Sequence, residues 1–258
     1  GSYKPLNDIN ESALGWEVPI ESVPLPSGGL LYSPDSFFYN KSLIQIKAMT
    51  AREEDILSSR AYSKEGSAID HLIASCTGAS LKDIGQLLLG DRNALLISIR
   101  VTGYGADYNI EVSCPECGAT NKTEFDLSQL PIKRLEVEPV EIGENLFEVV
   151  LPVTKKSVRV KFLTGHDEKE MMIINERKKK KGLSTDTGIT DRLTRCIESV
   201  DGITNKNKIS FFVKNMPVRD SLALRKFLDN QEPGVVMKGD LRCNSCFEES
   251  EVDLPIGP

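Results

Sequence analysis

Four of the six cysteines stand in two Cys-x-x-Cys pairs, Cys114-Pro115-Glu116-Cys117 and Cys243-Asn244-Ser245-Cys246. Two thiols separated by two residues on a tight turn can bind one face of the same metal ion. Two such turns supply four thiolates, which form the ligand set of a closed tetrahedral zinc site. The sequence therefore predicts one metal site with the ligands Cys114, Cys117, Cys243 and Cys246.

Zinc is the metal that we expect at this site. An iron–sulfur cluster is also held by four thiolates, and the spacing alone argues only weakly against it. A thioredoxin-type redox pair is disfavoured because the motif occurs twice and neither copy has a βαβ pattern around it. Four protein thiolates leave no open position for a substrate, so the predicted ion is structural.

A shared site would close residues 118–242 into a loop. The entropy of loop closure grows slowly with length, so such a loop costs only about 2 kcal/mol more than a loop of about 15 residues. Gly118 follows the first pair and suits a left-handed turn, whereas Phe247 holds the equivalent place after the second pair. The two turns therefore need not be identical.

Other catalytic constellations are not evident. The two histidines lie apart: His71 falls inside a predicted short helix and His166 at a predicted helix start. Gly103-Tyr104-Gly105 lacks the third glycine of a dinucleotide fingerprint and follows a helix instead of opening one. We therefore predict a protein without enzymatic activity or a small-molecule substrate.

The composition is that of a folded protein that acts away from membranes. The 258 residues are 40% hydrophobic and carry a formal net charge of −6. No apolar run approaches the roughly 20 residues that a bilayer crossing requires. The acidic balance disfavours nucleic acid as a partner. Cys76 and Cys196 stand in apolar helical patterns and are predicted to be buried free thiols.

The cysteine pairs are each flanked by predicted strands. Residues 108–112 alternate in polarity and lead into the first pair, and residues 122–125 lead out of it. Residues 235–241 and 249–254 flank the second pair in the same way. A strand, a Cys-x-x-Cys turn (a knuckle) and a strand make up one half of a zinc ribbon.

The segment before the first knuckle predicts a helical unit. After a strand at 43–48, Thr50 and Glu53 form a capping box at a helix start, and further helices are expected at 68–76, 81–89 and 93–101. The last of these is apolar nearly all round and therefore central. Gly90 fits a helix end and Asp91 the cap of the next helix.

Residues 3–40 show no clear period and contain many Pro, Gly, Ser and Asn residues, with Trp16 and other apolar residues among them. Two interpretations are open: an arm that lies on another surface, or an extended segment packed on its own domain.

The region between the knuckles predicts a β-hairpin, 146–151 with 157–162, and helices at 167–181, 190–198 and 217–229. The basic run 177–181 ends the first of these helices, where cations are favoured by the helix dipole. It could contact phosphate or an acidic partner, but a solvated helix end is the favoured interpretation.

Together these elements predict an α+β fold. It consists of an extended N-terminal arm (1–40), a helical unit (41–105), the first zinc-ribbon half (106–130), an inserted β-hairpin and helices (131–234), and the second half (235–258).

Several segments resemble one known family. Besides both knuckles, they are 49–57 (MTAREEDIL), 90–96 (GDRNALL), 99–105 (IRVTGYG) and 215–220 (NMPVRD). The chain resembles the baseplate hub proteins of T4-like contractile-tailed bacteriophages, over residues 25–254. Members of this family often continue into an aromatic-rich tail, so the resemblance implies a short further piece beyond Pro258.

The resemblance implies a non-enzymatic structural or assembly subunit of the phage tail baseplate. Its partners would be other baseplate or tail proteins. It would reside in the virion, or in the host cytoplasm during assembly. The alternative is a nucleic-acid-associated zinc-ribbon protein, which the acidic charge and the lack of basic residues interleaved with aromatic residues around the knuckles disfavour.

Overall fold

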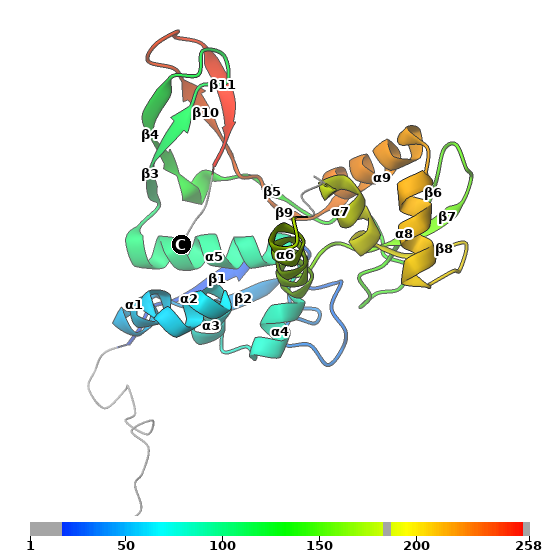
Figure 1. The fold of residues 1–258 in the computed structure, drawn as a ribbon. Coiled ribbons are helices and arrows are strands. Elements are labelled where there is room, and N and C mark those ends of the chain that lie inside the picture. The colour runs from blue at the N-terminus through cyan, green and yellow to red at the C-terminus, as the bar shows by residue number, and fades with distance from the viewer. Residues whose placement is uncertain (1–16, 183–186, 255–258) are drawn as a thin grey trace, which may run out of the picture.

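The computed structural model describes residues 17–182 and 187–254, which form helices and small antiparallel sheets (Figure 1). The predicted α+β class is confirmed. Trp16 and the first part of the predicted arm lie outside the described residues, as do the last four residues of the predicted second half.

The N-terminal unit combines a two-stranded ribbon with helices. The capping box is confirmed: the Glu53 carboxylate accepts a hydrogen bond from the Thr50 backbone N–H at 2.9 Å. The strands pair in antiparallel register with Ile20 opposite Lys47. The elements are β1 (Ile20–Pro24), β2 (Leu43–Lys47), α1 (Ala51–Ser58), α2 (Arg60–Glu65), α3 (Ala68–Thr77), α4 (Leu81–Gln86) and α5 (Leu89–Tyr104).

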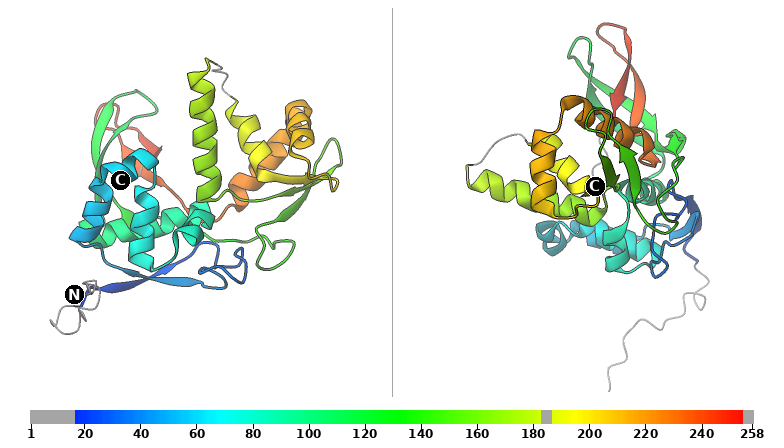
Figure 2. Two further views of the ribbon diagram at one scale, coloured as in Figure 1. Left: turned by 60° about the horizontal axis from the view of Figure 1, so that its bottom comes forward. Right: turned by 90° about the vertical axis from the view of Figure 1, so that its right-hand side faces the viewer.

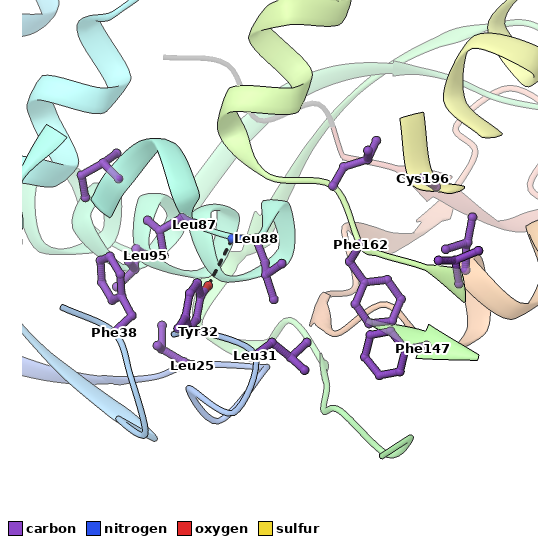
Figure 3. Close-up of a cluster of buried hydrophobic side chains, with 14 of the residues drawn as sticks. Leu25, Leu31, Tyr32, Phe38, Leu87, Leu88, Leu95, Phe147, Phe162 and Cys196 are labelled. Carbon is purple, nitrogen blue, oxygen red and sulfur yellow. Dashed lines mark hydrogen bonds between the residues drawn. The ribbon is translucent and has the colours of Figure 1, made fainter. Parts of the chain in front are cut away.

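The described part of the predicted arm packs on the helices of its own chain. Val23, Leu25, Leu31 and Phe38 are buried in the largest hydrophobic cluster. The hydroxyl of Tyr32 accepts a hydrogen bond from the backbone N–H of Leu88 at 3.1 Å (Figure 3). Residues 17–40 therefore contribute to the core.

The predicted helix break at Gly90 and Asp91 is wrong, because both residues lie in the first turn of α5. Gly90 permits a close approach: a Cβ atom there would lie 1.7 Å from the carbonyl oxygen of Pro233. Asp91 is fully buried and accepts hydrogen bonds from the Ser27 backbone N–H at 2.9 Å and the Tyr32 hydroxyl at 2.6 Å. Both residue types thus serve long-range contacts that a local pattern does not reveal.

Helix α5 is central, as its apolar sequence predicts. Leu95 and Ile99 belong to the large cluster, whereas Ile97 packs with Tyr108 and Leu127 below the knuckle hairpins. The N-terminal elements therefore lie on one side of this helix and the two hairpins on the other (Figure 1).

The inserted region forms a three-stranded antiparallel sheet with helices. Its predicted hairpin is confirmed. The helix predicted at 190–198 ends at Cys196, because the buried Ile197 pairs with Val160 and starts a third strand. Helix α8 was not predicted. The elements are β6 (Phe147–Val150), β7 (Ser157–Val160), α6 (Gly165–Lys180), α7 (Gly188–Cys196), β8 (Ile197–Val200), α8 (Lys206–Asn215) and α9 (Val218–Gln231).

One hydrophobic cluster joins the N-terminal unit to the inserted region. Leu25 and Leu88 from the former and Phe147 and Phe162 from the latter are all members (Figure 3). The rings of Phe147 and Phe162 have centroids 4.7 Å apart. These two parts of the chain therefore share a core, as one cooperative unit does.

The chain leaves and re-enters the knuckle region through a short pairing of β5 (Ile132–Lys133) with β9 (Gly234–Val235). The knuckle hairpins stand beyond this crossing, apart from the helices of the inserted region (Figures 1 and 2). Among the described residues, no helix has both the length and the apolar character that a membrane crossing needs.

Candidate metal centre

Two β-hairpins bring the cysteine pairs together. The first consists of β3 (Asp107–Ser113) and β4 (Thr120–Asp126), preceding the 3₁₀ turn η3 (Leu127–Gln129). The second consists of β10 (Lys238–Arg242) and β11 (Glu249–Asp253). Each Cys-x-x-Cys motif occupies the loop that joins its two strands, as the sequence predicts.

The two knuckles have matching backbone hydrogen bonds. The N–H of Cys114 donates to the carbonyl of Ala119 at 2.9 Å, and that of Cys243 donates to the carbonyl of Glu248 at 3.0 Å. The N–H of Gly118 donates to the carbonyl of Cys114 at 2.9 Å, and the N–H of Phe247 donates to the carbonyl of Cys243 at 3.0 Å. The sequence predicted only that the two turns need not be identical, and the structure shows that their backbone hydrogen bonds match.

Gly118 and Phe247 also share a left-handed backbone conformation, with φ values of 74° and 63°. Glycine adopts this region freely, but a residue with a Cβ does so at a cost. The second knuckle therefore stores local strain that the first knuckle avoids.

The four cysteine Sγ atoms converge on one point. All four lie within 4.8 Å of one another, with Cys114 Sγ 3.8 Å from Cys246 Sγ and Cys117 Sγ 3.6 Å from Cys243 Sγ. Four sulfurs placed tetrahedrally about 2.3 Å from a zinc ion would lie about 3.8 Å apart. A disulfide would instead require about 2.05 Å. The arrangement therefore fits a single bound ion.

A small hydrophobic cluster holds the hairpins against each other. Its buried members come from both hairpins and the residue that follows the second: Val112, Cys114, Leu241, Cys243, Val252 and Leu254. Gly239 lets the backbone of β10 approach the ring of Phe125 on β4, where an added Cβ would lie 2.3 Å from a ring carbon. The convergence of the thiols thus rests on packing as well as on the two turns.

Asn121 connects the hairpins directly, and sequence reasoning did not identify it. Its buried side chain accepts a hydrogen bond from the Asn244 backbone N–H at 2.8 Å. Its amide nitrogen donates to the carbonyl of Ala119 at 2.9 Å and lies 3.5 Å from the Sγ atom of Cys243. Such a group orients a ligand without binding the ion. Asn121 lies just before the strand predicted at 122–125, so the sequence offered no signal for its role.

A sequence model of the T4 bacteriophage base plate protein family matches residues 24–255. The chain belongs to this family. No curated protein and no solved structure matched the sequence. The resemblance seen in the separate motifs is thereby confirmed over nearly the whole chain, and the cysteine cluster belongs to a structural protein of the phage tail baseplate.

The thiols of this baseplate protein differ in their affinity for protons. The backbone N–H groups of Cys246 and Ser245 lower the pKa of Cys243 to about 6. At Cys246 the backbone N–H of Glu248 lowers the pKa, but burial and the neighbouring thiols outweigh it and raise the value to about 12. A cation must displace the remaining protons, so its binding is coupled to pH.

The hairpins carry an acidic surface. From Asp107 to Asp126 there are five carboxylates and one lysine, and from Lys238 to Asp253 there are five carboxylates and two basic residues. This surface repels nucleic-acid phosphates, in contrast to the basic stripe expected of a nucleic-acid-binding module.

The remaining candidate groups do not join the metal centre. His71 stacks on Tyr62 with ring centroids 3.9 Å apart, and His166 lies 3.2 Å from the carboxylate of Glu170. Cys76 and Cys196 are free and buried, as predicted. Burial raises the pKa of each to about 12, which makes both thiols inert.

Proposed function

We propose that this protein is a non-enzymatic structural or assembly subunit of the phage baseplate hub. It would act through contacts with other baseplate or tail proteins, either in the virion or in the host cytoplasm during assembly. The family match over residues 24–255 supports this proposal.

We further propose that Cys114, Cys117, Cys243 and Cys246 hold one zinc ion and that the two hairpins form a split zinc ribbon. The distances of 3.6 Å and 3.8 Å between sulfurs of different knuckles support zinc. An iron–sulfur cluster would bind its thiolates through separate iron atoms and so hold them further apart. When bound, zinc would supply a closed Lewis-acid centre that ties the four sulfurs together.

In this proposal the ion fastens the end of the chain to its middle. It would close residues 118–242 into a loop and so restrain the inserted region relative to α5. Because the unfolded chain has no preformed site, metal binding would stabilise the folded state. The five-segment division of the chain, with the second half at 235–258, is part of this proposal.

We also propose that the protein has no enzymatic activity. Four protein thiolates would saturate the ion, which leaves no position for an activated water. Among the described residues, neither His71 nor His166 lies in the metal centre.

Affinity purification of the tagged chain from infected cells, followed by mass spectrometry, tests the proposed role. We expect baseplate or tail proteins to remain bound at moderate salt. Recovery of DNA instead, with an affinity that falls steeply as salt rises, would favour the nucleic-acid alternative.

A further inference from the structure

A groove of about 560 Å³ lies between α6, α7 and α8. Met171 and Ile174 of α6 line it with apolar atoms, and the small side chains of Thr190, Thr194 and Ser210 face it from the other helices. The only buried residue of α6 is Asp167, although α6 is sixteen residues long. Figure 2 shows α6 projecting beside α7. An isolated helix of this length is marginally stable, so its apolar positions favour a partner.

Two ion-pair clusters hold α6 beside α7 without filling the groove. Near the start of α6, Arg195 Nε lies 2.6 Å from the Asp167 carboxylate. Near its end, Lys178 Nζ lies 2.7 Å from the Asp191 carboxylate, which also accepts a hydrogen bond from the Thr187 hydroxyl. Between these clusters the helices face each other across short hydroxyl side chains, which explains the open space.

The outer end of the groove is basic. Lys214 of α8 lines it, and no described carboxylate lies within ion-pair distance of Lys214. Of the basic run 177–181, Lys178 lines the groove and is paired with Asp191, and the other four cations belong to the same helix end without lining the groove. The groove therefore suits a segment that combines an apolar side chain with carboxylates. Its apolar floor makes it a poor fit for a nucleic-acid backbone.

The tip of the second knuckle presents such a segment. Phe247 is 70% exposed and has a φ value of 63°. Gly118 makes the equivalent turn in the first knuckle without strain, so the fold itself does not require an aromatic residue there. Strained residues that folding does not require are often found at functional sites. Glu248 and Glu249 follow Phe247 directly and supply the carboxylates.

We propose that the knuckle tip of one copy, with Phe247 as the anchor, docks into the groove between α6, α7 and α8 of a second copy. Phe247 would lie on Met171 and Ile174, and Glu248 and Glu249 would face Lys214 and the basic end of α6. The turn between β10 and β11 and the helices α6, α7 and α8 lie on separate parts of the molecule (Figures 1 and 2), so the contact would join two chains. This inference rests on the proposed assembly role and deepens it by naming one partner of the subunit.

Such a contact is heterologous, because it joins different surfaces of the two copies. The resulting dimer keeps one free groove on the first copy and one free tip on the second, so further copies can add until a ring closes or a filament grows. Sedimentation velocity of the zinc-loaded full chain should therefore show a mass above one chain that rises with protein concentration. Raising the salt from about 50 mM to about 500 mM should weaken the association, because its charges are exposed.

Two substitutions test the tip and the groove independently. Phe247→Ala removes the anchoring ring and leaves the groove intact, whereas Ile174→Asp places a charge in the apolar part of the groove and leaves the tip intact. Each should weaken self-association by about tenfold or more, as loss of an anchor does. Matched controls are Phe211→Ala, an exposed Phe of α8 that does not line the groove, and Ile173→Asp, the neighbouring exposed residue of α6. Both controls should associate as the unmodified chain does.

Mixing the two defective variants gives the decisive result. The Phe247→Ala chain retains a groove and the Ile174→Asp chain retains a tip, so an equal mixture should form a dimer with one copy of each and grow no further. Circular dichroism confirms that each variant is folded. A strictly monomeric unmodified chain, or a mixture that stays monomeric, would overturn the proposal. Capture of other baseplate proteins by that monomer would leave the proposed function standing.

Discussion

The side-chain oxygen of Asn121 lies 2.8 Å from the backbone nitrogen of Asn244, and the two residues belong to different knuckle hairpins. The same side chain lies 3.5 Å from the Sγ atom of Cys243. One buried amide therefore links the strand of the first hairpin to the turn of the second. It holds the Cys243 sulfur in place without belonging to the four-cysteine cluster.

Asn121→Ala should weaken metal binding by about 10- to 100-fold, because it removes a group that orients a ligand. It should also destabilise the folded protein by about 1–3 kcal/mol, since the Asn244 N–H loses its buried partner. Competition with a chromophoric chelator measures the affinity. Asn109→Ala on the exposed face of β3 is the control and should change neither quantity. Unchanged affinity in the Asn121 variant would show that this amide does not orient the Cys243 sulfur.

Cys243→Ser should reduce bound zinc from about one ion per chain to well below that value, because three thiolates hold zinc less tightly than four. It should also loosen the C-terminal hairpin. Elemental analysis of the purified protein measures the metal, and Cys196→Ala, which removes a buried thiol outside the cluster, should keep it. Full zinc content in the Cys243 variant would contradict the proposal that one ion is shared by four thiolates.

Phe247→Gly should stabilise the isolated chain by about 1 kcal/mol, because it relieves the left-handed strain at φ 63°. Phe247→Ala removes the same ring but keeps a Cβ, so it should bring no such gain. Chemical denaturation of the zinc-loaded proteins compares the two. Equal stability of the glycine and alanine variants would show that the backbone carries no strain there.

Gly90→Ala should destabilise the protein by about 3 kcal/mol or more, because the new methyl group would meet the Pro233 carbonyl at 1.7 Å. Gly85→Ala is the matched control, since Gly85 lies in α4 and a Cβ added there would have no neighbouring atom within 4 Å. Alanine should stabilise that helix by up to about 1 kcal/mol. In thermal unfolding, the Gly90 variant should have a lower midpoint temperature than the unmodified chain and the Gly85 variant a higher one.

Asp167→Asn should lower the free energy of unfolding by about 2 kcal/mol at neutral pH. This loss is smaller than the loss expected from breaking a fully buried ion pair, because Lys161 and Arg195 are partly exposed. Burial raises the pKa of Asp167, but the Thr164 backbone N–H and Lys161 outweigh it and hold the pKa below its usual value. The stabilisation is therefore present above about pH 4 and is lost as the pH falls through the lower, folded-state pKa.

Urea denaturation at several pH values measures this dependence. The difference between the unmodified chain and the Asp167 variant should narrow below about pH 4. Glu111→Gln breaks an exposed pair with Lys122 and should have little effect at any pH. A constant difference down to the lowest pH would show that the Asp167 charge does not stabilise the fold.

Local sequence signals were sufficient to predict much of the candidate metal centre. The spacing of Cys114 and Cys117, and of Cys243 and Cys246, depends on a turn of a few residues, so each knuckle and its strands could be predicted. The capping box at Thr50 and the apolar character of α5 are also properties of neighbouring residues. These features require no knowledge of distant parts of the chain.

The tertiary structure decided how those pieces are joined. Gly90 and Asp91 have the residue types of a helix boundary, yet Pro233 and the buried polar groups around Asp91 place both inside α5. Ile197 continues a helical pattern but pairs with Val160 as a strand. Asn121 meets Asn244 only because two distant hairpins pack together. Since long-range burial and hydrogen bonding outweigh local propensity at these positions, the sequence alone determined the cysteine pairs and their turns, whereas the folded chain determined their convergence.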